Sequence, residues 1–172
     1  MDEKVLVQRA VREDKEAFAA LYMRYRDALY RYACFRLGND ADAEDAVSAC
    51  ITAAYENIRS LRAEKAFGTW IFRILHRCCC TIVKDRIADR NNVAEDALGS
   101  VPDEDKGRLS PELKEAFGVL EDEDREIVLL SVIAGYNSRE LGALLRMKPA
   151  TVRSRLARSL TKMRTFLSLA DK

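Results

Sequence analysis

The most constraining feature of this chain is the stretch from Gly135 to Leu156, in which turn residues separate two short helical patterns. The first pattern has an apolar stripe formed by Leu141, Leu144 and Leu145. Asn137 precedes it and Glu140 follows three residues later, which predicts an Asn variant of the capping box. Pro149 cannot lie inside the first helix but suits the first turn of a second one. The pattern therefore predicts two short helices joined by a tight turn.

The second of these helices is strongly basic, and no acidic residue occurs between Glu140 and Asp171. The bases of this stretch are Arg146, Lys148, Arg153, Arg155, Arg158, Lys162 and Arg164. Helical spacing places Val152, Leu156, Leu160 and Met163 on a packing side. It places Thr151, Ser154, Arg155, Arg158 and Lys162 on the other side, with Arg153 at its flank. A helix-turn-helix with so cationic a second helix favours entry into a DNA groove, while a solvated basic face on a bundle helix is the alternative.

The remainder of the chain predicts an all-α protein made of two small helical domains. Its 172 residues include only seven Gly and three Pro, and no strand-like alternation is evident. Residues 87–109 are acidic, contain Gly99, Pro102 and Gly107, and indicate a flexible linker. We therefore expect domains at 1–86 and 110–172. The expected helices lie at about 3–12, 15–37, 42–58, 64–86, 111–120, 123–134, 138–146 and 150–168.

Several kinds of chemistry have no support in the composition. The chain has five cysteines, an odd number, in neither a disulfide framework nor a zinc-finger spacing, and His76 is its one histidine. We expect no metal, no cofactor and no catalytic residue, so the chain is not expected to be an enzyme. The absence of a signal peptide and of any membrane-length apolar run predicts a cytoplasmic protein without membrane insertion.

Two further clusters lie in the N-terminal half. Aromatic side chains alternate with bases between Phe67 and Arg86, a pattern that suits single-stranded nucleic acid because rings stack on bases while cations neutralise phosphates. Core packing is the alternative for Phe67 and Trp70, and the one that we favour. The predicted third helix begins with Asp42, Glu44 and Asp45, which suit either a basic partner surface or the helix dipole, and both explanations remain open.

Specific strings in both halves resemble the extracytoplasmic-function (ECF) sigma factors of bacterial RNA polymerase. The C-terminal strings are Leu120, Asp124–Leu130, Gly135-Tyr136 and Thr151–Leu156, which look like region four. The N-terminal strings are Asp42–Val47, Ala54-Tyr55, Phe67 and Thr69–Ile74, which look like region two. The resemblance covers nearly the whole chain and implies a region-two helical bundle and a region-four helix-turn-helix domain.

The resemblance also implies partners and site residues. Region four would read the −35 promoter element through Thr151, Arg153, Ser154, Arg155, Arg158 and Lys162. Region two would hold the melted −10 element through Phe67, Trp70, Arg73, Arg77 and Lys84. It would bind core RNA polymerase through Asp42, Glu44, Asp45, Ser48 and Tyr55. A cognate anti-sigma factor is the further partner that this family implies.

The chain departs from the family pattern at several positions. Arg77 stands where an Asn commonly holds a flipped promoter base, and Thr81 replaces a frequent Asp or Asn. Ser48 and Ala49 replace the usual Gln-Glu of the polymerase-binding helix. In the C-terminal half, Ala157 replaces a larger ring-bearing residue and Arg146 replaces a frequent Gly. These departures bear on promoter preference, and on the −10 element more than on the −35 element.

Three functions are compatible with these patterns. The expected one is an ECF-type sigma factor that directs promoter-specific transcription initiation. The alternative is a stand-alone helix-turn-helix regulator with an N-terminal sensing or dimerising domain, which would bind paired half-sites without polymerase. A helical adaptor without a DNA role is the third.

Overall fold

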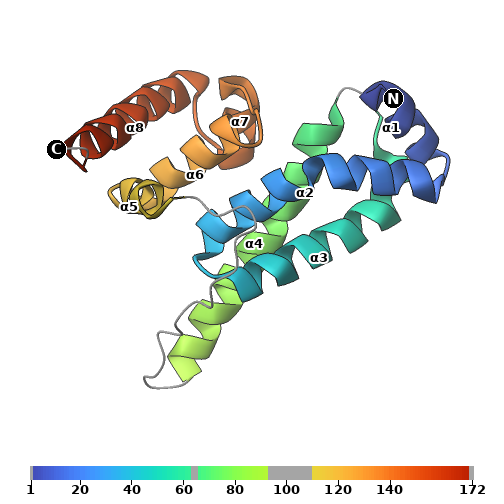
Figure 1. Cartoon of the computed structure of the whole chain (residues 1–172), viewed down its shortest axis with the longest axis horizontal. Coiled ribbons are helices and arrows are strands. Elements are labelled where there is room, and N and C mark those ends of the chain that lie inside the picture. Colours follow the sequence, from blue (N-terminus) through green and yellow to red (C-terminus); the bar gives the residue numbers. More distant parts are fainter. Residues whose placement is uncertain (1, 63–65, 93–109, 171–172) are drawn as a thin grey trace. The chain divides into compact units, whose positions relative to one another are not determined.

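The computed structural model describes residues 2–62, 66–92 and 110–170 of the chain. All the regular elements of these ranges are helices, as the sequence predicts (Figure 1). The chain divides into two compact units, residues 1–107 and residues 108–172. Most of the predicted linker, residues 93–109, lies outside the described residues.

The N-terminal unit contains four α-helices: α1 (Glu3–Val11), α2 (Lys15–Leu37), α3 (Asp40–Asn57) and α4 (Phe67–Asn92). A short 3₁₀ turn, η1 (Ile58–Ser60), follows α3. Helices α2, α3 and α4 pack against one another, and α1 packs against α2 and η1 (Figure 1). Helix α4 was predicted to end near Arg86, but it continues to Asn92, because the chain has neither Gly nor Pro at this point to stop it.

Local sequence explains where these helices begin and end. Gly38 adopts the left-handed conformation and closes α2, with its N–H donating to the Cys34 carbonyl at 2.8 Å. Asn39 then caps α3 by accepting from the Asp42 N–H at 2.8 Å. This tight connection reverses the chain, so that α3 lies against α2.

The core of the N-terminal unit is rich in aromatic rings that meet edge to face. Tyr32 of α2 and Phe72 of α4 are both buried, with ring centroids 5.8 Å apart. Tyr25 meets the fully buried Phe67 at 5.3 Å. These contacts fix the face of α4 that points inward, and therefore also the face that is left to solvent.

The C-terminal unit contains α5 (Pro111–Gly118), α6 (Asp122–Val132), α7 (Ser138–Leu145) and α8 (Pro149–Ala170). Helix α8 packs against all three of the others. Its buried residues are Val152, Ser159 and Met163. Leu160, which was predicted on the packing side, is 38% exposed instead, because α8 turns Ser159 rather than Leu160 toward the core.

Ser159 is an unusual core residue, because its hydroxyl is fully buried and makes no hydrogen bond in the described part of the protein. An unsatisfied buried hydroxyl costs free energy on folding. We therefore expect Ser159→Ala to raise the free energy of unfolding by about 1 kcal/mol in urea denaturation. Ser168→Ala, at an exposed position of the same helix, is the matched control and should change stability by less than about 0.5 kcal/mol. A Ser159→Ala protein that is less stable than the wild type would contradict this reading.

Candidate nucleic-acid and polymerase interfaces

The predicted helix-turn-helix is formed by α7 and α8, and its first helix carries the predicted capping box. The Asn137 side chain accepts from the N–H groups of Arg139 and Glu140 at 2.9 and 3.0 Å. The Glu140 carboxylate in return accepts from the Asn137 N–H at 2.9 Å. Both ends of the box are satisfied, so the start of α7 is fixed.

The turn between the two helices is tight. The Met147 N–H donates to the Gly142 carbonyl at 2.9 Å, which folds the chain back over the end of α7. A side chain at position 142 would have its Cβ only 2.6 Å from the Met147 carbonyl oxygen. Glycine at position 142 therefore allows the turn to approach α7. The path of this turn sets the direction of α8.

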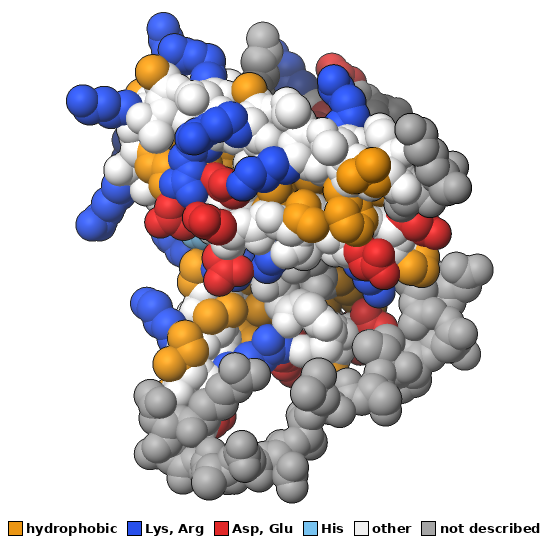
Figure 2. All heavy atoms as spheres, turned by 90° about the vertical axis from the view of Figure 1, so that its left-hand side faces the viewer, with side chains coloured by type: hydrophobic (Ala, Val, Ile, Leu, Met, Phe, Trp, Pro, Cys, Tyr) orange, Lys and Arg blue, Asp and Glu red, His pale blue; other side chains and the backbone are white. Residues whose placement is uncertain are grey.

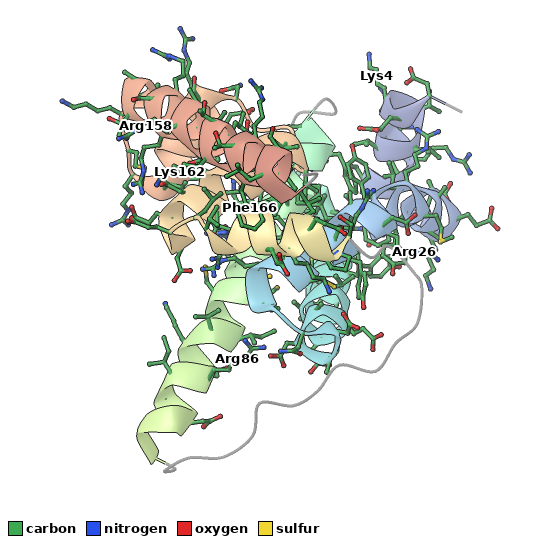
Figure 3. The ribbon with its side chains drawn as sticks, turned by 60° about the vertical axis from the view of Figure 1, so that its left-hand side comes forward. Lys4, Arg26, Arg86, Arg158, Lys162 and Phe166 are labelled. Carbon is green, nitrogen blue, oxygen red and sulfur yellow. The ribbon has the colours of Figure 1, made fainter. Side chains whose placement is uncertain are left out.

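Helix α8 presents a polar and basic face. Five of the six residues predicted there have exposed side chains, namely Thr151, Arg153, Ser154, Arg158 and Lys162. Arg158 and Lys162 extend from α8 in Figure 3. Figure 2 shows one face of the protein, on which Lys and Arg side chains project outward. The Arg153 guanidinium of α8 also donates to the Ser138 hydroxyl of α7, at 3.4 Å. The face offers cations and hydroxyls to phosphates and base edges.

Arg155 differs from these five residues, because its guanidinium has partners within the protein. Its Nε donates to Asp124 at 2.6 Å and its Nη1 donates to Glu123 at 2.5 Å, both on α6. Its side chain is 17% exposed, and the bonds to Glu123 and then Asp124 raise its pKa. Two of the five N–H donors of the Arg155 guanidinium are therefore engaged within the protein. We infer that Arg155 mainly holds α8 on α6, and a DNA contact by Arg155 stays a prediction.

Helix α4 exposes a second basic face. Arg73, Arg77 and Lys84 are all exposed, and their spacing places them on one side of the helix, with the partly exposed Trp70 beside them. This face combines one aromatic ring, which can stack on a base, with three cations, which can contact phosphates of single-stranded nucleic acid. Phe67 does not belong to this face. It is fully buried against Tyr25 and Trp70, so the core alternative is correct for this residue.

The predicted polymerase-binding residues lie mostly on one exposed side of α3. Glu44, Asp45 and Ser48 are exposed, and so is Tyr55, which is 40% exposed as a residue and packs its ring edge to face on Phe18. Asp42 differs. Its carboxylate forms a salt bridge with Arg86 of α4, which also donates to the Leu37 carbonyl at 2.8 Å. Asp42 therefore joins α3 to α4, and its role in binding the polymerase stays a prediction.

The ion pairs of Asp42 and Arg155 share one feature, which is a long separation in sequence. Arg86 lies far from Asp42 in sequence, and Arg155 lies 31 residues from Asp124. No local pattern in the sequence indicates pairing at such separations. The sequence therefore predicts which residues are charged, but not which of them form ion pairs within the folded protein.

The cysteines and His76 do not form a metal centre among the described residues, where no group of three or more His, Cys, Asp or Glu side chains could hold an ion. His76 lies 3.2 Å from the Tyr32 hydroxyl and 3.6 Å from the Cys80 sulfur. Cys50 is buried, and its thiol donates a hydrogen bond to the Ile71 carbonyl at 3.6 Å. Burial raises the pKa of the Cys50 thiol, so it stays protonated. In the described ranges, no helix has the length and apolar character needed to cross a membrane.

Two family models match the chain in order. Sigma-70 region 2 matches residues 21–88, and Sigma-70 region 4 matches residues 110–163. Together they cover most of the α2–α4 bundle and most of the helix-turn-helix.

Curated relatives agree with this match. The ECF RNA polymerase sigma factor SigE of Mycolicibacterium smegmatis is 30% identical over 156 residues, an alignment that covers 86% of this chain and 60% of that protein. SigW of Bacillus subtilis is 27% identical over 180 residues, covering 95% of this chain and 96% of SigW. The sigma-E factor of Escherichia coli is 28% identical over 174 residues, covering 92% of this chain and 91% of that protein.

Solved structures share the fold. CnrH, in complex with the cytosolic domain of CnrY, matches with a TM-score of 0.70 at 23% identity, covering 99% of both chains. RpoE of Bartonella quintana, in complex with the anti-sigma factor NepR, matches with a TM-score of 0.70 at 20% identity, covering 88% of this chain and 96% of that one.

Proposed function

The chain belongs to the ECF sigma factor family of bacterial RNA polymerase, and we propose that it binds the core enzyme and directs it to a specific set of promoters. The observation that carries this proposal is the pairing of a region-two bundle with a region-four helix-turn-helix whose α8 leaves a basic face exposed. The polymerase would supply the chemistry, in the cytoplasm, and this chain would supply promoter choice.

We propose that α8 lies in the major groove of the −35 element. Thr151, Arg153, Ser154, Arg158 and Lys162 would make the contacts, because they are exposed and none is held by an intramolecular salt bridge within the described ranges. Arginine recognises a guanine edge through two parallel hydrogen bonds, which suits Arg153 and Arg158. Hydroxyl groups of Thr151 and Ser154 would bond to phosphates or base edges.

The N-terminal unit would perform two tasks. The acidic and polar side of α3, with Glu44, Asp45, Ser48 and Tyr55, would bind the core enzyme. The basic face of α4, with Trp70, Arg73, Arg77 and Lys84, would hold the melted −10 strand. The two faces are on different helices, so both could be occupied at once.

A cognate anti-sigma factor is the regulatory partner that we propose. Two of the solved structures that share this fold are described as complexes, one with the cytosolic domain of CnrY and one with the anti-sigma factor NepR. A partner of this kind would cover the polymerase-facing surfaces and keep the chain inactive.

Arg77 allows a test of the −10 assignment. Its guanidinium is exposed, and it can donate hydrogen bonds but cannot accept them. If Arg77 holds a phosphate, as we expect, then Arg77→Asn should lower transcription from all members of a randomised −10 library and leave the preferred sequence unchanged. Sequencing the transcripts measures both quantities.

The same library distinguishes the other outcomes. A changed −10 preference would show that Arg77 reads a base instead. Unchanged output and unchanged preference would place Arg77 off the DNA path. Lys15→Asn, which removes an exposed charge from α2, is the control and should leave the transcripts unchanged.

A gel shift at controlled salt separates this function from its two alternatives. We expect the chain alone to bind promoter DNA weakly, and to bind it well in the presence of core enzyme. A dimeric regulator would bind well alone, and an adaptor would bind in neither case. Salt concentration must be fixed, because phosphate contacts make affinity strongly salt-dependent.

A further inference from the structure

Two bases in the turn before α8 occupy positions that local structure disfavours. Arg146 ends α7 in the left-handed conformation, with φ of 56°. A Cβ makes this conformation costly, and glycine adopts it freely. Among the described residues, Gly38 and Gly135 also have a positive φ, and Glu13 is the other non-glycine residue that does.

Lys148 is the second base of this kind. Its carbonyl accepts the first helical hydrogen bond of α8, from the Val152 N–H at 3.1 Å, so it occupies the N-cap position. A lysine side chain has no acceptor with which to cap the free N–H groups of the first turn. Its charge also lies at the positive end of the helix dipole, which is unfavourable.

Neither side chain obtains compensation within the protein. Both are exposed, and within the described ranges neither forms a hydrogen bond or a salt bridge. The nearest carboxylate in sequence, that of Glu140, is engaged by the Asn137 N–H. Residues that oppose the local structure without an internal partner are characteristic of functional positions.

The position of the pair indicates its ligand. Arg146 and Lys148 directly precede Thr151 and Arg153, the start of the exposed face that we assign to the −35 element. The sequence has no acidic residue between Glu140 and Asp171, so α8 itself supplies no negative charge near Arg146 and Lys148. An adjacent polyanion would relieve the repulsion between Lys148 and the helix dipole.

We propose that Arg146 and Lys148 are additional phosphate contacts, which extend the −35 interface from α8 onto the turn. This inference rests on the proposed function, because it requires that α8 faces promoter DNA. The contacts would add affinity for any DNA sequence and would not change which −35 sequence is preferred.

The test replaces each base by a residue that the local structure favours. Asn tolerates the left-handed conformation, and Ser is a good N-cap. The full-length Arg146→Asn, Lys148→Ser protein should therefore melt at a temperature equal to or above that of the wild type. Its affinity for promoter DNA, measured with core enzyme across a salt series, should fall. The log–log slope on salt should become shallower by about 0.9 for each lost contact, or about 2 for both.

Two controls make the result specific. Arg146→Lys keeps the charge and should retain most of the salt slope, whereas Lys114→Ser removes an exposed charge from α5 and should leave the slope unchanged. A double variant with wild-type affinity and slope, in a preparation where Arg153→Ala weakens binding, would overturn this inference and leave the proposed function standing. Absence of promoter binding by the wild type with core enzyme would overturn both.

Discussion

Replacing Arg153 and Arg158 together by alanine is expected to weaken holoenzyme binding to a −35 element by about 30-fold or more. Both guanidinium groups are exposed on α8, and neither is held by a carboxylate in the described part of the protein. A bidentate contact to guanine contributes about 1–3 kcal/mol of binding free energy, and the contributions of separate contacts are approximately additive. Fluorescence anisotropy of a labelled promoter fragment, with the variant assembled on core enzyme, measures the change.

The matched variant is Lys114→Ala, which removes an exposed cation from α5 of the same unit and should leave affinity nearly unchanged. Competition with fragments that carry single −35 substitutions gives a second readout. If Arg153 or Arg158 reads a base, its loss should relax preference at one base pair. Equal affinity of the double variant and the wild type would show that α8 is not the recognition helix.

Gly142→Ala is expected to have the largest effect on folding. A Cβ at this position would lie 2.6 Å from the Met147 carbonyl oxygen, which is backbone and cannot move aside without opening the turn. An alanine within a helix ordinarily adds about 1 kcal/mol of stability relative to glycine. We expect the clash to exceed this gain and to lower the free energy of unfolding by about 2 kcal/mol. Urea denaturation measures the loss.

Gly118→Ala provides a control with opposite sign. Gly118 ends α5, has no atom within 4 Å of an added Cβ, and does not have a positive φ. Its replacement should leave stability unchanged or raise it. Because the turn directs α8, Gly142→Ala should also weaken promoter binding, although it removes no charge. A Gly142→Ala protein that is as stable as Gly118→Ala would contradict the tight packing of the turn.

The helices were largely predictable, because each begins or ends at a residue with a local preference. Asn137 and Glu140 form the predicted capping box, and Ser110 caps α5 with Pro111 behind it. Gly38 ends α2. Helix caps of this kind involve residues only three or four positions apart, so the sequence alone predicts them. The end of α4 was missed because no such signal is present there.

The interfaces were less predictable, because exposure depends on distant residues. Arg155 and Arg158 both belong to the predicted basic face, yet Arg155 is paired with two carboxylates of α6 while Arg158 is exposed. Phe67 and Trp70 likewise lie one turn apart, and only Phe67 is fully buried. Periodicity identifies the side of a helix, but the packing of the neighbouring helices decides which residues at its edge remain available.

The central proposal is that this chain gives core RNA polymerase its choice of promoter. In vitro transcription on a fragmented genomic DNA pool, with core enzyme and this protein, tests it most directly. We expect transcripts that start at a small set of positions, preceded by shared −10 and −35 elements, and that disappear when the chain is omitted. Core enzyme that yields the same starts with and without the chain would contradict the proposal.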